Sequence, residues 1–163
     1  MFGVKIMRTL TKEGTLRSAR FILPARTYTV FELMNITGMT RQQVSYWSKL
    51  GIVTPGISQQ SESTGPGYKS LYAVTDVIEG LIVSELRRSG FSLQAIRKVV
   101  ARLKAEGIEL YESAPFLLTD GRSVYYAYSD KEVVDLLRAH RQQLLLLSLE
   151  EQLGKVPDIR KAA

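Results

Sequence analysis

Two short segments before the middle of the chain space their apolar residues as helices do, and both begin with the same start signal. Thr29 stands three residues before Glu32, and Thr40 stands three residues before Gln43. A threonine hydroxyl at a helix start accepts a bond from the third helical amide, and a Glu or Gln there returns a bond to the threonine amide. The pattern predicts two helices, the first ended by Gly38, and therefore a helix-turn-helix.

The apolar positions of both segments predict the side that each helix buries. They recur at intervals of three or four residues, which is the spacing of one helix face. The expected core residues are Val30, Leu33 and Met34 in the first helix, and Val44, Trp47 and Leu50 in the second, which Gly51 ends.

The outer face of the second predicted helix is polar from its first residue onward. Arg41, Gln42, Ser45 and Lys49 fall at positions i, i+1, i+4 and i+8, on one side of a helix. Arginine suits guanine O6 and N7, and glutamine suits adenine N6 and N7, so the pattern is typical of a recognition helix in the major groove. Any amphipathic surface helix also has a polar outer face, so this helix alone leaves both interpretations open.

The residues after the second helix predict a hairpin and two further helices. Residues 52–54 and 70–72 are expected to be short strands on either side of a Gly-, Ser- and Pro-rich stretch, the layout of a wing. Thr75 is the expected start of a helix that Gly90 ends, and Ser92 starts another that Gly107 ends. The expected core residues are Ile78, Leu81, Ile82 and Leu86, then Leu93, Ile96, Val99, Val100 and Leu103, with Arg97, Lys98, Arg102 and Lys104 exposed.

The C-terminal third is interrupted by Gly107, Pro115 and the Asp120-Gly121 pair too often for one long helix. Residues 116–119 and 123–126 flank a tight turn and predict a β-hairpin. Ser129 and Glu132 form a third predicted capping box, before a helix with Val133, Val134, Leu136 and Leu137. Residues 144–147, four leucines, either extend that helix or form a separate buried strand, and in both cases they are core or a dimer interface.

Positive charge is concentrated in the front of the chain. The net charge is +5 over residues 1–26, +4 over residues 27–104 and −3 over residues 105–163, which sums to the +6 of the whole chain. This distribution is expected when one half of a protein meets a polyanion. Residues 1–26 allow three interpretations: a targeting peptide, an arm on DNA phosphates, or an arm that packs on its own chain through Phe21, Ile22 and Leu23.

The composition excludes several kinds of chemistry. The absence of cysteine excludes disulfides, thiolate metal sites and a cysteine nucleophile, and a single His140 leaves little for a zinc site or a catalytic triad. No apolar run is long enough to span a bilayer. We therefore expect a cytoplasmic, nucleoid-associated protein without cofactor or enzymatic activity, and His140 as an ordinary helix residue. Tyr111, Tyr125, Tyr126 and Tyr128 either line a ligand pocket or, as we favour, are half-buried strand residues.

Residues 28–104 resemble the winged helix-turn-helix DNA-binding domain of the MerR family of transcriptional regulators. The matching stretches are residues 28–33, 37–40, 46–55, 67–69, 71–72 and 90–96. The most specific part is the run from Leu50-Gly51-Ile52 to Pro55, combined with Gly90-Phe91-Ser92 at the right distance.

The resemblance implies that the second helix enters the major groove and that wing residues hold phosphates. The residues implied to contact DNA are Thr40, Arg41, Gln42, Ser45, Tyr46, Lys49, Tyr68 and Lys69, with Tyr46, Tyr68 and Lys69 on phosphates. The chain departs from the family in three places. Ser45 stands where an arginine is frequent, the wing pattern between Tyr68 and Tyr72 is stretched, and the long dimer-forming helix is missing.

The predicted fold is mainly α with small β elements: a winged helix-turn-helix followed by a small α+β region. The predicted units are a basic arm at 1–26, the MerR-like domain at 27–106, and a hairpin–helix region at 107–163 for dimerisation or for binding a partner or effector. The predicted function is sequence-specific regulation of transcription on double-stranded DNA as a homodimer, with RNA polymerase or another protein as a further partner. The alternative is a DNA-binding antitoxin or a DNA-bending accessory factor whose C-terminal region binds a partner protein.

Overall fold

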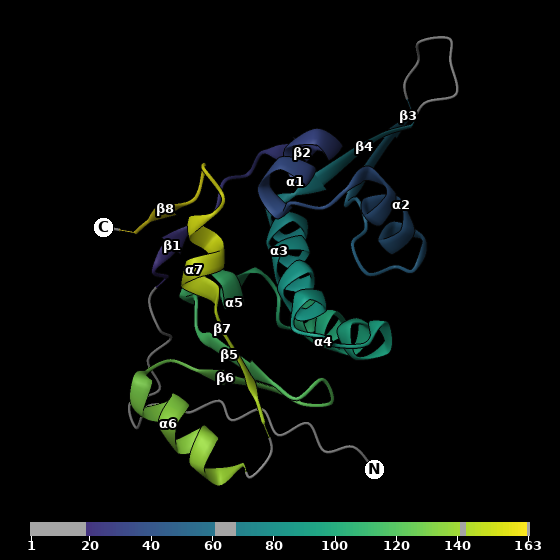
Figure 1. Ribbon diagram of the computed structural model, residues 1–163. Coiled ribbons are helices and arrows are strands. Elements are labelled where there is room, and N and C mark those ends of the chain that lie inside the picture. Colours follow the sequence, from purple (N-terminus) through teal and green to yellow (C-terminus); the bar gives the residue numbers. More distant parts are fainter. Residues whose placement is uncertain (1–18, 61–67, 141–142, 163) are drawn as a thin grey trace.

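The computed structural model describes residues 19–60, 68–140 and 143–162 (Figure 1). Helices α1 (Val30–Thr37) and α2 (Arg41–Lys49) form the predicted helix-turn-helix. Both capping boxes are confirmed: the Glu32 amide donates to Thr29 Oγ1 over 3.3 Å, and the Gln43 amide donates to Thr40 Oγ1 over 3.2 Å. Gly38 ends α1 with φ of 74°, a left-handed conformation that glycine adopts without strain.

A three-stranded antiparallel sheet in the order β2-β4-β3 flanks the two helices. Its strands are β2 (Thr27–Thr29), β3 (Ile57–Gln60) and β4 (Tyr68–Ala73). Strand β4 contains the predicted strand at 70–72, but the strand predicted at 52–54 is wrong. Ile52 and Val53 are fully buried, and both of their amides donate to the Trp47 carbonyl, which ties them to the end of α2 and not to a ladder. Residues 61–67 of the expected wing lie outside the described residues.

Helix α3 (Val74–Arg88) runs through the centre of the molecule, and α4 (Leu93–Glu106) follows it. The prediction that Thr75 caps α3 is wrong, because the N-cap is Ala73, two residues earlier, whose amide donates to the Asp76 carboxylate over 2.7 Å. Ser92 starts α4 as predicted, and its hydroxyl accepts the Ala95 amide. The predicted apolar faces of both helices are buried apart from the half-buried Leu93, whereas Arg102 is half-buried and not exposed.

The C-terminal part adds short helices to a second antiparallel sheet in the order β6-β5-β7. Its elements are α5 (Ile108–Ser113), β5 (Phe116–Thr119), β6 (Val124–Ala127), α6 (Asp130–Ala139), β7 (Leu145–Ser148), α7 (Leu149–Gly154) and β8 (Arg160–Lys161). The hairpin β5–β6 is confirmed, and the leucine run forms a strand and not a helix extension. Ser129 starts α6, but the Glu132 carboxylate accepts the Tyr128 amide, one residue earlier than a capping box requires.

The described end of the N-terminal arm packs on its own chain. Strand β1 (Phe21–Ile22) pairs antiparallel with β8, and Phe21 is buried. Of the three interpretations of residues 1–26, the packing one therefore applies to this end of the arm, although Ile22 is exposed. Residues 1–18 lie outside the described residues.

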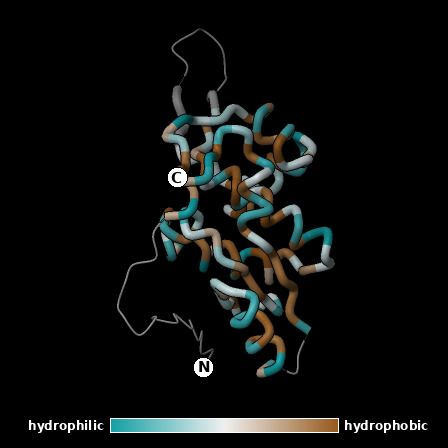
Figure 2. The backbone as a smooth tube through the Cα atoms, turned by 90° about the vertical axis from the view of Figure 1, so that its left-hand side faces the viewer, coloured by the Kyte–Doolittle hydropathy of each residue, from teal (hydrophilic) through white to brown (hydrophobic). Residues whose placement is uncertain are grey.

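One hydrophobic core joins the helix-turn-helix to the C-terminal part. It includes Tyr28 and Leu33 at the front of the chain and Leu149 and Val156 near its end, and hydrophobic segments run through the middle of the molecule (Figure 2). A second, smaller core lies between α6 and the sheet of β5 and β6. Within the described ranges, no helix is both long and apolar enough to cross a membrane.

Helices α1 and α3 pack closely at Gly80. A Cβ atom there would lie 3.1 Å from Thr37 Cγ2 and 3.4 Å from Leu33 Cδ1. We expect Gly80→Leu to lower the free energy of unfolding by about 1–2 kcal/mol, because overpacking outweighs the better helix propensity of leucine. Urea unfolding monitored by circular dichroism measures the change. Gly154→Leu, in a helix position with no atom within 4 Å of a new Cβ, is the control, and a Gly80→Leu protein as stable as wild type would contradict the close packing.

Candidate nucleic-acid interface

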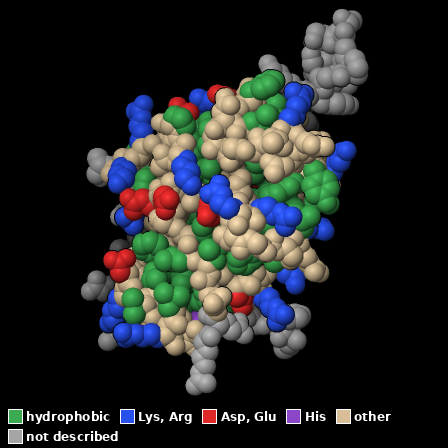
Figure 3. Space-filling model, in the orientation of Figure 1, with side chains coloured by type: hydrophobic (Ala, Val, Ile, Leu, Met, Phe, Trp, Pro, Cys, Tyr) green, Lys and Arg blue, Asp and Glu red, His purple; other side chains and the backbone are tan. Residues whose placement is uncertain are grey.

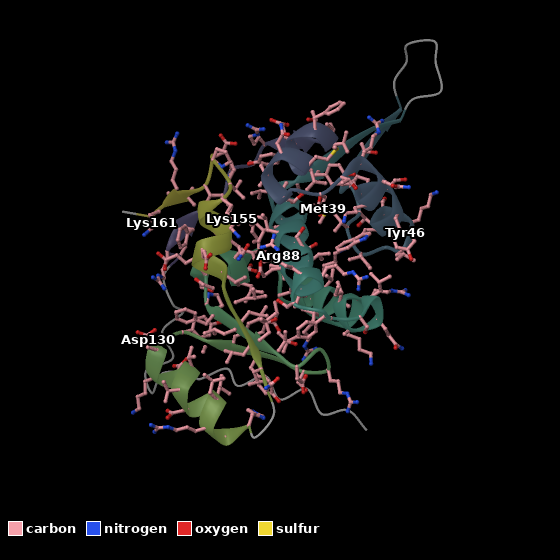
Figure 4. All side chains as sticks on the ribbon, in the orientation of Figure 1. Met39, Tyr46, Arg88, Asp130, Lys155 and Lys161 are labelled. Carbon is pink, nitrogen blue, oxygen red and sulfur yellow. The ribbon has the colours of Figure 1, made fainter. Side chains whose placement is uncertain are left out.

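Helix α2 presents one face to the core and the opposite face to solvent. Val44 and Trp47 are buried on the inner face. The outer side chains together line one shallow hollow, made by Arg41, Gln42, Ser45, Tyr46 and Lys49. All five are exposed, and Tyr46 extends away from the body of the molecule (Figure 4). The structure thus brings five of the eight predicted site residues onto one continuous surface.

Of the other three predicted residues, Thr40 immediately precedes α2, and Tyr68 and Lys69 lie in strand β4. The hydroxyl of Thr40 is used in the cap of α2, so its place at the start of the outer face is fixed by the helix itself. Tyr68 and Lys69 lie in β4, with their backbones opposite Gln60 and Gln59 in β3. The β3–β4 ribbon projects away from the body of the molecule (Figure 1), but the side chains of Tyr68 and Lys69 lie outside what the structure describes.

Phe31 lies next to this surface and was not among the residues predicted to contact DNA. This side chain lies in the first turn of α1 and is 62% exposed, the largest fraction among the exposed large hydrophobic residues of the described ranges. The guanidinium carbon of Arg41 lies 5.8 Å from the centre of its ring, within the range of a cation–π contact. Phe31 directly follows Val30 and is not one of the expected core residues, and a large aromatic residue outside that set is the signal that would have singled it out.

Among the described residues, no acidic side chain neutralises the charge on the outer face of α2. Neither Arg41 nor Lys49 makes an ion pair with a residue in the described ranges. Arg26 contrasts with them, because it pairs with both Glu32 and Asp158 and stacks over the Tyr28 ring. The hydrogen bond from the Thr29 amide keeps the pKa of the Glu32 carboxyl group below its usual value, and the hydrogen bond from Arg26 adds a smaller effect. Arg26 therefore joins the two ends of the chain and contributes little free positive charge.

Further basic groups lie where α3 ends, next to the turn between α1 and α2. A second hollow there is lined by Thr37, Gly38, Met39, Gln43, Trp47, Ser84, Arg87 and Arg88. Arg87 is exposed and donates to the Phe91 carbonyl over 3.3 Å, and Arg88 pairs with Glu85 over 3.0 Å. Figure 3 shows lysine and arginine side chains spread over this face of the molecule, several of them near its centre, where α3 runs. The basic surface therefore continues from α2 toward the end of α3.

Behind this surface, a buried carboxyl group ties three helices together. Glu79 in α3 is 4% exposed, accepts a hydrogen bond from the Tyr111 hydroxyl of α5 over 3.2 Å, and lies 3.9 Å from Lys104 Nζ of α4. Burial raises the pKa of Glu79 to about 7, and the Lys104 ammonium opposes the shift. Glu79 faces the interior and not the hollow on α2, so its part is structural.

The tyrosines proposed for a ligand pocket are mostly core residues. Tyr125 and Tyr126 lie in strand β6 as favoured, but they are buried and not half-buried, and Tyr111 is buried in a helix and not in a strand. His140 follows the last turn of α6 and its ring centre lies 4.5 Å from that of Tyr125, as expected of an ordinary helix-end residue. Across the described part of the chain, no three His, Cys, Asp or Glu side chains are grouped as a metal site requires.

Comparison with known proteins identifies the same region. Residues 28–103 match the family model described as MerR HTH family regulatory protein. Relatives with 36% identity over 103 residues are uncharacterized HTH-type transcriptional regulators of Mycobacterium bovis and of two strains of Mycobacterium tuberculosis. The alignment covers 63% of this chain and 44% of each relative, so the match spans less than half the length of these curated relatives.

Proposed function

Residues 28–103 form a helix-turn-helix domain of the MerR family, and from this premise we propose that the protein regulates transcription by binding a specific double-stranded DNA sequence as a homodimer. In this proposal α2 enters the major groove, the β3–β4 hairpin acts as the wing, and Tyr68 and Lys69 hold phosphates. Residues 107–163 provide the dimer contacts or those with RNA polymerase or another partner. Sequence specificity requires side chains that reach base edges, and in this proposal α2 supplies them.

The observation that carries the proposal is the outer face of α2. It offers hydrogen-bonding groups of several kinds at the first turns of a helix, where base edges come within reach. Arg41 and Gln42 are exposed, and Arg41 makes no ion pair with a described residue, so its guanidinium is available for guanine O6 and N7. Phe31 supports Arg41 from the side and restricts where its guanidinium points.

Titrating paired duplexes separates base contacts from phosphate contacts. On the preferred site, obtained by selection from random duplexes, Arg41→Ala is expected to cost about 1–3 kcal/mol, with little loss on a scrambled duplex. Phe31→Ala is expected to lose part of the same extra binding free energy on the preferred site, because the Arg41 side chain is then less restrained. Lys69→Ala is expected to weaken both duplexes by similar factors, as a phosphate contact does.

The control for this experiment is Arg122→Ala, an exposed arginine in the β5–β6 turn to which the proposal gives no DNA contact. It should bind both duplexes as the wild type does. If Arg41→Ala loses equally on the specific and the scrambled duplex, Arg41 is a phosphate contact, and the placement of α2 in the groove is wrong.

A further inference from the structure

Helix α6 has an apolar flank that no described part of the chain covers. Its inner residues Val133 and Leu136 are 7% and 6% exposed and pack against the sheet of β5 and β6. Val134 and Leu137, three residues apart on the neighbouring side, are 43% and 42% exposed. Residues with this spacing are adjacent on a helix surface, so the two side chains form one apolar patch.

Opposite charges stand four residues on either side of Val134. Asp130 lies four residues before Val134, and Arg138 lies four residues after it, so all three share one side of the helix. Both charged residues are exposed, and neither makes an ion pair within the described ranges. Figure 4 shows Asp130 at the N-terminal end of α6, on the outside of the molecule.

This arrangement is complementary to itself. If two copies of α6 lie antiparallel across a two-fold axis at Val134, residue 130 of each copy faces residue 138 of the other. The two valines then meet at the axis beside the two leucines, and two identical Asp130–Arg138 pairs close the ends. A parallel arrangement would instead place like charges together, so the charges select the antiparallel one.

We propose that α6 is the homodimer interface, with a second copy of this chain as its occupant and antiparallel α6 helices at its centre. This inference rests on the proposed function, which requires a dimer but does not say where it forms. The sequence left residues 144–147 as core or a dimer interface, and this inference places the interface on α6 instead. That run already packs within its own chain in part, because β7 pairs with β5 and the Leu147 side chain is buried.

The small size of the interface limits how tight the dimer can be. A ten-residue helix is about 15 Å long, so a pair of them buries less than the roughly 1,200 Å² at the lower end of stable interfaces. The free protein is therefore expected to be a weak dimer, in which two charge pairs make a measurable contribution. On DNA, two adjacent half-sites raise the local concentration of the second copy and complete the dimer.

Sedimentation equilibrium of the full chain, over a concentration series up to the solubility limit, tests the proposal by charge reversal. Asp130→Arg and Arg138→Asp are each expected to raise the dimer dissociation constant roughly tenfold, since two attractive pairs become repulsive. The double variant restores both pairs in reversed order and should recover most of the wild-type association. Circular dichroism checks that every variant retains its helices. Asp135→Arg, an exposed acid on the opposite flank of α6, is the matched control and should change nothing.

The results distinguish this inference from the proposed function. A monomer at every concentration, or a dimer that ignores both single reversals, overturns the α6 interface. In the second case the homodimer itself stands and forms elsewhere. Single reversals that weaken association without rescue by the double variant also overturn the antiparallel pairing. DNA binding by Asp130→Arg to a single half-site should equal that of the wild type, and that measurement tests α2 independently of α6.

Discussion

The affinity of the protein for DNA is expected to fall roughly 300- to 1,000-fold when the salt concentration rises from about 50 to about 200 mM. Residues 1–104 carry a net charge of +9 against −3 for the remainder. If about five phosphates are neutralised, the logarithm of the binding constant falls with the logarithm of salt at a slope of roughly −4 to −5, because each contact releases counterions. Fluorescence anisotropy of a labelled duplex over a series of salt concentrations measures this slope.

Two lysine variants show where the released ions come from. Lys49→Gln removes an exposed charge on the outer face of α2 and is expected to reduce the slope by about one unit. Lys131→Gln removes an exposed charge on α6, far from α2 in Figure 1, and is expected to leave the slope unchanged. A binding constant that hardly changes with salt would contradict a phosphate-contacting surface, and equal effects of both variants would mean that α2 is not its centre.

Glu79→Gln is expected to stabilise the folded protein by about 2–3 kcal/mol at pH 8 and by much less at pH 5. In the folded protein, burial raises the pKa of Glu79 to about 7 from the ordinary value of 4.5. Between these two values the unfolded chain releases a proton that the folded chain keeps. Stability therefore declines as pH rises through this window and levels off above pH 7. Glutamine removes the ionisation and still accepts the Tyr111 hydroxyl.

Urea unfolding at a series of pH values between 5 and 8 checks this prediction. Glu85→Gln is the control, because this residue lies on the same helix but is half-exposed and pairs with Arg88 at the surface. Its effect should be small and should hardly change with pH. A Glu79→Gln protein that is less stable than the wild type at pH 8 would show that the Lys104 ammonium compensates the buried carboxylate more fully than its 3.9 Å separation indicates.

Elements whose limits depend on local chemistry were predictable from the sequence. The starts of α1, α2 and α4 follow from Thr29, Thr40 and Ser92, whose hydroxyls bond amides only three residues away. The end of α1 at Gly38 is equally local. The face of α2 was predictable for the same reason, because a helix places residues 41, 42, 45 and 49 together whatever surrounds it.

Features that depend on distant residues were not predictable in this way. The Asp76 carboxylate also binds the Gly56 amide, so the start of α3 depends on a loop twenty positions earlier. Ile52 and Val53 are apolar because they fill the core beyond α2, and burial alone does not distinguish such a turn from a strand. Four consecutive leucines have neither helix nor strand periodicity, so only pairing with β5 decides their structure.

The same distinction explains what was missed at the candidate interface. Phe31 and Arg41 belong to different helices, and their contact depends on how α1 and α2 pack against each other. The pairing of β1 with β8 joins the two ends of the chain, and the bond from Arg26 to Asp158 does so again. Neither contact has a signature in the local sequence.

The most direct test of the central claim is a selection of bound sequences from a pool of random double-stranded DNA, performed in parallel with the wild-type chain and Arg41→Ala. We expect the wild type to enrich one motif. Arg41→Ala should still bind DNA but enrich that motif weakly or not at all. A wild-type pool without any enriched motif would contradict sequence-specific binding. The same motif enriched equally by both proteins would contradict its recognition by the outer face of α2.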